Sequence, residues 1–221
     1  MKKFVLLIYI LAHVIVTKAQ EGFSIATDFS VLRSISKNQG FFAIGQTIQG
    51  NVHFTNTESL YGWLSYYTNG SFKNTLTATA KDPATSPRNI NYTSSSKLSY
   101  QQVSIGWKHF FVGGAESESA YTIYGLAGFG LVSGKIENTW DKSIDSANYI
   151  FELRAIEGSA TFKRLTFDIG IGTEARLATS VYLYADLRSW LPASNFPSPY
   201  LYNNSLPRVI IASMGLRILF N

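Results

Sequence analysis

Charged side chains of both signs recur at every second position in several parts of the sequence. Between residues 164 and 176, even-numbered positions hold Arg164, Asp168, Glu174 and Arg176, whereas most odd-numbered positions are apolar. Acids and bases on one face of a sheet can form ion pairs, and a buried charge must be paired to be tolerated. The polar faces of this and other alternating segments carry the set that we predict to form an ion-pair network: Asp28, Lys108, Arg164, Asp168, Glu174, Arg176, Asp186, Arg188 and Arg217.

Such a network allows two interpretations. It can fill a narrow interior with fixed salt bridges, or it can line a gated conduit in which the ion pairs rearrange. If the segments that carry these charges close into a barrel of eight strands, its interior is just wide enough for side chains. We therefore favour structural filling, with a small pore as the alternative.

Other chemistry has little support in the sequence. The chain has no Cys, and beyond residue 19 its histidines are His53 and His109. Two separated histidines without further ligands are insufficient for a metal site. We therefore predict no metal and no cofactor.

The elements that must position the charged residues are β-strands, because successive side chains of a strand point to opposite faces. In 164–176 and in 181–190 one face is apolar and the other is polar. A soluble sandwich and a membrane barrel both use this pattern. We predict eight strands, from alternating apolar and polar residues or from the turn signals that bound them: Phe23–Ser34, Phe41–Thr55, Leu60–Asn69, Leu98–Phe111, Ala120–Ile136, Leu165–Ala175, Val181–Trp190 and Arg208–Phe220.

The connections between these segments alternate in length. They are short after the second, fourth and sixth segments. After the third, fifth and seventh they are long and polar, comprising Gly70–Lys97, Glu137–Thr161 and Leu191–Pro207, and we predict solvated loops there. Because Tyr149–Ile156 alternates, we also predict that the strands flanking Glu137–Thr161 project into solvent as a hairpin. Strands of about ten residues suit a tilted membrane crossing, whereas strands of soluble sheets are commonly shorter. The pattern favours a membrane barrel.

The N-terminus indicates export. Lys2 and Lys3 precede the apolar stretch Phe4–Val16, and Thr17-Lys18-Ala19 resembles a cleavage site. We predict a signal peptide at residues 1–19, a mature chain that begins near Gln20, and one barrel domain over residues 20–221. Cleavage removes three lysines and no acid, so the formal net charge falls from +5 to +2. No basic face of the kind that binds nucleic acid is evident.

The chain resembles the eight-stranded outer-membrane β-barrel family of Gram-negative bacteria, which includes the OmpA transmembrane domain. The resemblance rests on FDIGIGTEARLATSVYLYADLRS (167–189), YTIYGLAGFGLVSGK (121–135) and MGLRILF (214–220). It implies an all-β, antiparallel up-and-down transmembrane barrel in the outer membrane, in contact with its lipid, with short periplasmic turns and long external loops. It also implies recognition of the C-terminal strand by the barrel-assembly machinery. Members commonly end in an aromatic residue, whereas here Phe220 is followed by Asn221.

The resemblance also bears on catalysis. Some eight-stranded barrels modify lipid A with a His, a Ser and an acid near the external rim. The predicted topology puts His53 and His109 at the periplasmic end, so we expect no enzyme. Trp63 and Trp107 would lie near the periplasmic rim and Trp190 near the external one, either in interfacial aromatic girdles or packed in the core.

These observations lead to a functional prediction with two alternatives. We expect a non-enzymatic integral outer-membrane protein that supports the cell envelope or interacts with a surface partner through its loops. The first alternative is a narrow, porin-like channel for ions or small solutes. The second is a soluble secreted barrel that binds an apolar ligand, which would need the apolar strand faces to point inward.

Overall fold

The computed structural model describes residues 22–117, 121–151, 155–194, 198–202 and 206–220. The predicted signal peptide at residues 1–19 and the terminal Asn221 lie outside these ranges. Within the described part of the chain, no helix is long and apolar enough to cross a membrane. The strands are β1 (Phe23–Ser34), β2 (Phe42–His53), β3 (Glu58–Ala80), β4 (Asn89–Val112), β5 (Thr122–Trp140), β6 (Tyr149–Phe151), β7 (Gly158–Ala178), β8 (Val181–Pro192) and β9 (Val209–Phe220).

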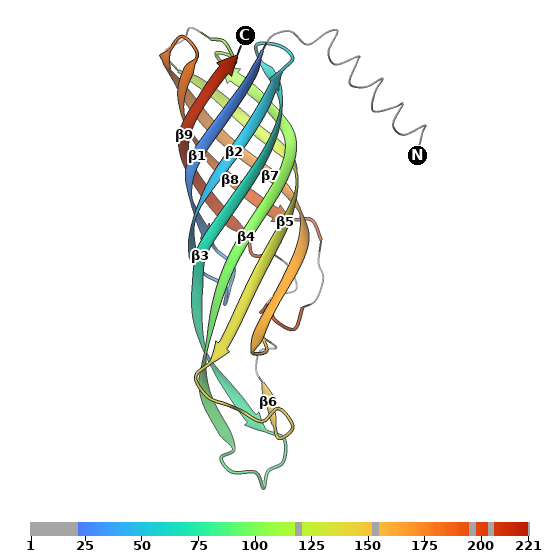
Figure 1. The fold of residues 1–221 in the computed structure, drawn as a ribbon. Coiled ribbons are helices and arrows are strands. Elements are labelled where there is room, and N and C mark those ends of the chain that lie inside the picture. Colours follow the sequence, from blue (N-terminus) through green and yellow to red (C-terminus); the bar gives the residue numbers. More distant parts are fainter. Residues whose placement is uncertain (1–21, 118–120, 152–154, 195–197, 203–205, 221) are drawn as a thin grey trace, which may run out of the picture.

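Eight of these strands close into a barrel (Figure 1). Every pairing is antiparallel, and the chain runs from β1 to β5 and from β7 to β9 with each strand beside the next. Closure comes from β1 and β9, which pair over their full lengths, from Phe23 opposite Phe220 to Ser34 opposite Val209. The short β6 pairs with β3 outside the barrel. The predicted all-β, eight-stranded antiparallel up-and-down barrel is confirmed.

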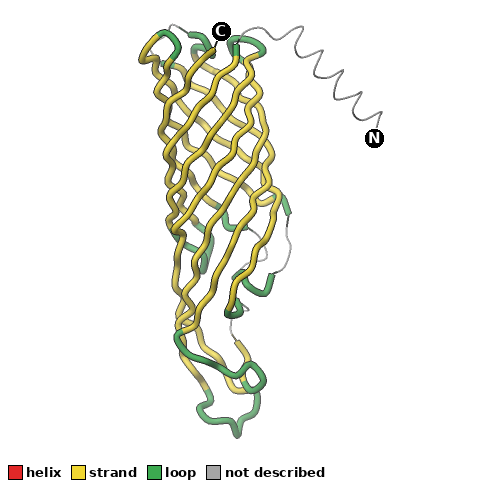
Figure 2. The backbone as a smooth tube through the Cα atoms, viewed as in Figure 1, coloured by secondary structure: helices red, strands yellow, loops and turns green. Residues whose placement is uncertain are grey.

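The two ends of the barrel differ. The connections 54–57 and 179–180 and the described residues 113–117 of the β4–β5 connection lie at the end where β9 finishes (Figure 2), which we call the short-turn end. The long connections lie at the opposite end, which we call the long-hairpin end. There β3 and β4 stay paired from Gly70 opposite Leu98 to Thr79 opposite Asn89. The predicted solvated loop Gly70–Lys97 is therefore wrong, because most of it is a projecting β-hairpin.

The second long segment, Glu137–Thr161, is also partly strand, in agreement with the predicted projection of its flanking strands. β5 continues to Trp140 and β7 begins at Gly158, so the two remain paired beyond their predicted limits. A small core stabilises the projecting sheet, since apolar side chains recur on one face of its strands. Its buried members are Leu76, Ala78, Tyr92, Ile144 and Tyr149.

The apolar faces of the barrel point outward and the polar faces point inward. Ile169 is 40% exposed on the outside, whereas Asp168 beside it is only 2% exposed. The same alternation runs along β1, β2 and β9. A soluble barrel that holds an apolar ligand would need the reverse orientation, so the structure contradicts that alternative.

Inward-facing glycines make room for aromatic rings in the narrow interior. Gly172 lies opposite Tyr124 and Gly45 lies opposite Tyr67. A Cβ atom at either glycine would come within 2.4 Å of the facing ring. Glycine within a strand is typical where another group approaches closely. These pairs explain why the alternating segments contain so many glycines on their polar faces.

Candidate functional site

The barrel interior holds most of the charged residues that the sequence analysis selected. Near the short-turn end, Glu174 of β7 lies between two cations. Lys108 of β4 donates a hydrogen bond to Glu174 Oε1, and Arg217 of β9 donates from Nε to Oε2 at 2.9 Å. All three side chains are at most 2% exposed. One carboxylate thus joins two strands that are distant in sequence, and the cluster keeps one net positive charge.

Aromatic rings and a backbone carbonyl stabilise the two cations of this cluster further. The Lys108 ammonium lies 3.7 Å from the centre of the Tyr124 ring, and the Arg217 guanidinium lies 4.1 Å from that of Tyr182. Cations are attracted to the faces of such rings. Arg217 also donates to the Ala115 carbonyl at 3.0 Å, which ties the β4–β5 connection to the interior.

A second cluster centres on Arg188 of β8. Its Nη2 lies 2.7 Å from Asp28 Oδ2 and donates to the hydroxyl of Ser213. Its Nε lies 2.9 Å from Asp186 Oδ1. Tyr184 donates to Asp28 at 3.0 Å. This cluster carries one net negative charge, opposite to that of the Glu174 cluster.

Asp168 is bound by neutral donors. Ser104 donates to its Oδ2 at 2.5 Å and Gln102 donates to its Oδ1 at 2.8 Å. None of the ion pairs among the described residues includes Asp168, so its carboxylate depends on hydrogen bonds from β4. This differs from the expectation that each acid would meet a base.

The remaining two residues of the predicted network lie elsewhere. Arg164 is buried on the inward face of β7, where its Nη1 donates to the Lys163 carbonyl at 2.8 Å. Arg176 lies at the β7–β8 turn and donates to the carbonyls of Ala178 and Thr179 at 3.2 and 3.0 Å. Arg176 is half-buried and pairs with the buried Tyr182 of β8, so it lies on the inward side of β7 at the rim of the barrel.

A neutral polar network around His53 was not singled out from the sequence. His53 Nε2 lies 2.9 Å from Ser24 Oγ, and its Nδ1 lies 2.6 Å from Ser59 Oγ. Asn51 donates to the same Ser24 oxygen at 3.1 Å. The signal for these residues was their shared position on the polar strand face. A general base of the serine-hydrolase kind is oriented by a carboxylate, whereas His53 contacts two hydroxyls and is fully buried.

His109 lies on the outside of the barrel, near the short-turn end. Its Nδ1 is 2.6 Å from Glu58 Oε1, and Trp107 donates to the other oxygen of the same carboxylate. Trp107 is 43% exposed, whereas Trp63 and Trp190 are buried inside. Of the three tryptophans considered for the interfacial girdles, only Trp107 faces outward.

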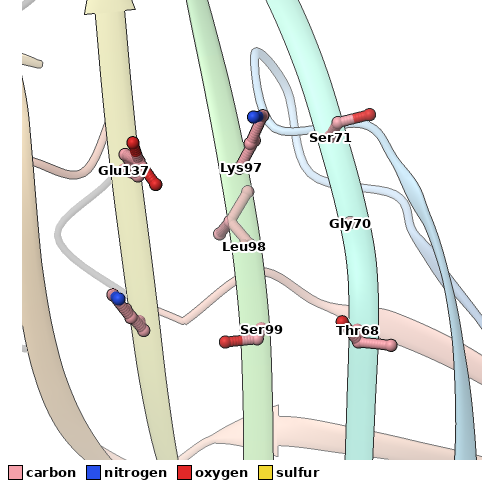
Figure 3. A pocket seen from close by; sticks show the side chains of 8 residues that line it. Thr68, Gly70, Ser71, Lys97, Leu98, Ser99 and Glu137 are labelled. Carbon is pink, nitrogen blue, oxygen red and sulfur yellow. The ribbon is translucent and has the colours of Figure 1, made fainter.

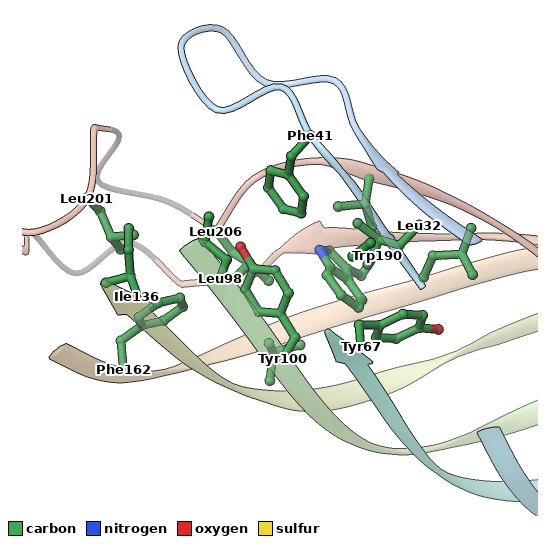
Figure 4. Close-up of a cluster of buried hydrophobic side chains, with 14 of the residues drawn as sticks. Leu32, Phe41, Tyr67, Leu98, Tyr100, Ile136, Phe162, Trp190, Leu201 and Leu206 are labelled. Carbon is green, nitrogen blue, oxygen red and sulfur yellow. The ribbon is translucent and has the colours of Figure 1, made fainter. Parts of the chain in front are cut away.

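Apolar side chains close the interior toward the long-hairpin end (Figure 4). We call this group the interior plug, and its largest members are Phe41, Tyr67, Phe72, Tyr100, Phe162 and Trp190. The Trp190 ring lies 5.9 Å from that of Tyr67 and 5.8 Å from that of Tyr100, both edge-on. Its Nε1 donates to the Pro207 carbonyl at 3.0 Å. Leu201 and Leu206 of the β8–β9 connection complete the plug.

Little space is left between the plug and the charged clusters. A cavity there, lined by Trp63, Asp168, Arg188 and Trp190 among others, has a volume of about 10 Å³. A single water needs roughly that much space. No group of three or more metal-binding side chains occurs among the described residues. Between the charged clusters and the plug, side chains therefore fill this part of the interior.

Comparison with known proteins supports the architecture. No family model and no curated protein sequence matches this chain. Among solved structures, Neisserial surface protein A matches with a TM-score of 0.57 and 14% identity, over 90% of this chain and 98% of the other. Ail, the attachment invasion locus protein of Yersinia pestis, matches with a TM-score of 0.50 and 12% identity, over 91% and 100%. This chain has the fold of the eight-stranded outer-membrane β-barrels.

The outside of this outer-membrane barrel fold carries the features that such folds present to lipid. Transmembrane barrels have an apolar band bordered by aromatic residues. Here the outward side chains of β1 and β9 are apolar over most of their length, and Phe23 of β1 stacks on Phe220 of β9 at 6.2 Å. Trp107 stacks on Phe54 at 5.5 Å near the short-turn end. Aromatic side chains therefore border the apolar band near the short-turn end, as they do in transmembrane barrels.

Proposed function

We propose that this chain is a non-enzymatic integral outer-membrane protein whose barrel is closed by its own side chains. It supports the cell envelope or presents its long hairpins to a surface partner. The proposal rests on one observation: the exterior of the barrel is apolar and its interior is filled with side chains. An apolar exterior is stable in lipid and costly in water. A filled interior supports a structural role over a channel.

We also propose how the chain is exported and inserted into the outer membrane. Residues 1–19 act as a signal peptide, and residues 20–221 form the barrel domain. The barrel-assembly machinery recognises β9, whose last residue is Phe220. The short-turn end then faces the periplasm and the long-hairpin end faces the cell exterior, as in other barrels with short periplasmic turns.

The long hairpins suit a role in surface interaction. The β3–β4 hairpin extends beyond the barrel and is braced by β6, which pairs with residues 78–80. Lys81 donates to the carbonyls of Ser146 and Ala147 at 2.9 and 2.8 Å, which links this hairpin to the β5–β6 connection. A braced hairpin presents a fixed surface, so a partner binds it without first paying to order a loop.

If the barrel spans a membrane, replacement of an exposed isoleucine with arginine should affect stability at one site and not at another. Ile169→Arg puts a charge in the middle of the apolar band and should destabilise the inserted barrel by about 2–4 kcal/mol. Ile150→Arg makes the same change on β6, where Ile150 is 59% exposed beyond the barrel. It should have little effect. Heat-modifiable mobility of refolded protein in lipid vesicles measures the inserted fraction of each variant.

A water-exposed barrel would behave differently in this assay. An arginine in place of an exposed isoleucine is well solvated in water, so both variants would match the wild type. Equal insertion of the two variants, or a wild-type chain that stays monomeric in plain buffer, contradicts the membrane assignment.

A further inference from the structure

A groove lies on the outside of the barrel toward the long-hairpin end, across β3, β4 and β5 (Figure 3). Its volume is about 460 Å³. The polar side chains that line it are Thr68, Ser71, Lys97, Ser99, Lys135 and Glu137. The groove therefore offers two cations and three hydroxyl groups, which are donors that suit a phosphate group.

The lysines of the groove belong to a larger basic set. Lys73 of β3, Lys97 of β4, Lys135 of β5 and Lys163 of β7 are exposed, one on each of four successive barrel strands. None of these ammonium groups makes a hydrogen bond or ion pair with a described residue. The set is thus available to an external anion.

The basic set borders the apolar band. Leu165 follows Lys163 by one outward position on β7, and Leu131 precedes Lys135 by two outward positions on β5. Both leucines are exposed. On the opposite border of the band, the outward described positions of β3, β4, β5 and β7 hold no lysine or arginine, and Glu58 is there instead. The positive charge is therefore confined to one side of the band.

We propose that this groove binds the phosphate headgroup of an anionic lipid, with Lys97 and Lys135 as the principal ligands. The inference rests on the proposed membrane insertion. The acyl chains lie on the exposed apolar residues of β4 and β5, and the headgroup lies at the groove. Lysines beside a membrane attract anionic lipids. The one-sided charge selects the leaflet at the long-hairpin end.

Glu137 provides an internal control for phosphate binding, because its charge is opposite to that of the two lysines. It lies opposite Lys97 in the β4–β5 register and lines the same groove. A carboxylate repels a phosphate. Removal of its charge should therefore strengthen binding, whereas removal of either lysine should weaken it. Loss of folding cannot produce both effects.

The experiment measures phosphatidylglycerol binding to the refolded protein in detergent micelles by native mass spectrometry. Near a membrane each lysine contributes roughly a fivefold gain in affinity, so Lys97→Gln with Lys135→Gln should weaken binding about 25-fold. Glu137→Gln should strengthen it. The matched control is Arg88→Gln with Arg208→Gln, which removes two exposed charges at the long-hairpin end outside the groove. This control should leave the affinity unchanged.

Each other outcome overturns the proposal in a different way. Equal weakening by the groove pair and the control pair indicates attraction to overall charge. Displacement of the lipid by millimolar inorganic phosphate indicates a site for free phosphate. Equal binding of phosphatidylcholine indicates that the lysines do not select anionic lipids. A chain that remains soluble without detergent contradicts the membrane assignment itself, independently of any variant.

Discussion

Replacement of Glu174 with glutamine should lower the free energy of unfolding by about 3–5 kcal/mol, because it leaves two buried cations without their counter-ion. Lys108 and Arg217 both bind this carboxylate inside the barrel. A glutamine has a similar size, so the packing changes little and the effect is mainly electrostatic. Urea-induced unfolding in lipid vesicles measures the change.

Two companion variants make this test specific. Glu116→Gln removes an acid that is exposed near the short-turn end, and it should not change stability measurably. Replacement of all three members of the cluster by apolar residues of similar volume should restore much of the lost stability, since buried ion pairs are often no better than good apolar packing. If Glu174→Gln is as stable as Glu116→Gln, the cluster does not hold the interior together.

Trp190→Ala should cost about 3–5 kcal/mol, as large-to-small substitutions of buried aromatic residues do. Trp190 is 1% exposed and contacts the rings of Tyr67 and Tyr100. Its loss opens a cavity in the middle of the interior plug and leaves the Pro207 carbonyl without its indole donor. The substitution therefore weakens both the core and the attachment of the β8–β9 connection.

A tryptophan on the outside provides the comparison. Trp107 is outward-facing, so Trp107→Ala leaves no cavity in the interior and should cost clearly less than Trp190→Ala. The same unfolding assay in vesicles compares the two. An equal loss of stability for both variants would contradict the assignment of Trp190 to an interior plug.

The sequence was most informative where alternation was strong. β1 has the predicted limits Phe23–Ser34, and the inward and outward faces of Leu165–Ala175 and Val181–Trp190 are those that the pattern indicated. In each of these strands the polar face is buried inside the barrel and the apolar face points outward. The alternation therefore determines the side to which each residue points. That regularity was sufficient to predict the barrel and most of its interior charges.

Alternation does not determine which residues meet across the barrel. Lys108 and Glu174 are 66 positions apart, and their contact depends on the register of two strand pairings, β4 with β5 and β5 with β7. The sequence also gave no separate signal for the interior plug, because Tyr67 lies in a segment with aromatic residues on both faces. Only the packed structure distinguishes Trp190, inside the plug, from a residue of an aromatic girdle.

The projecting hairpin was missed for a different reason. Residues 70–97 are rich in serine, threonine and asparagine, so their apolar positions are too sparse to mark a strand. Backbone hydrogen bonds to the neighbouring strand hold this segment, with Phe72, Leu76 and Tyr92 as the few buried anchors.

Single-channel conductance of the refolded protein in a planar lipid bilayer tests the closed-barrel account most directly. The cavity between the charged clusters and the interior plug that is lined by Asp168, Arg188 and Trp190 has a volume of about 10 Å³, which is too small for a hydrated ion. The account predicts stable insertion without discrete openings, with insertion verified by heat-modifiable mobility of protein recovered from the same lipid. Reproducible openings of uniform size in the wild-type protein would contradict it and would favour the narrow channel.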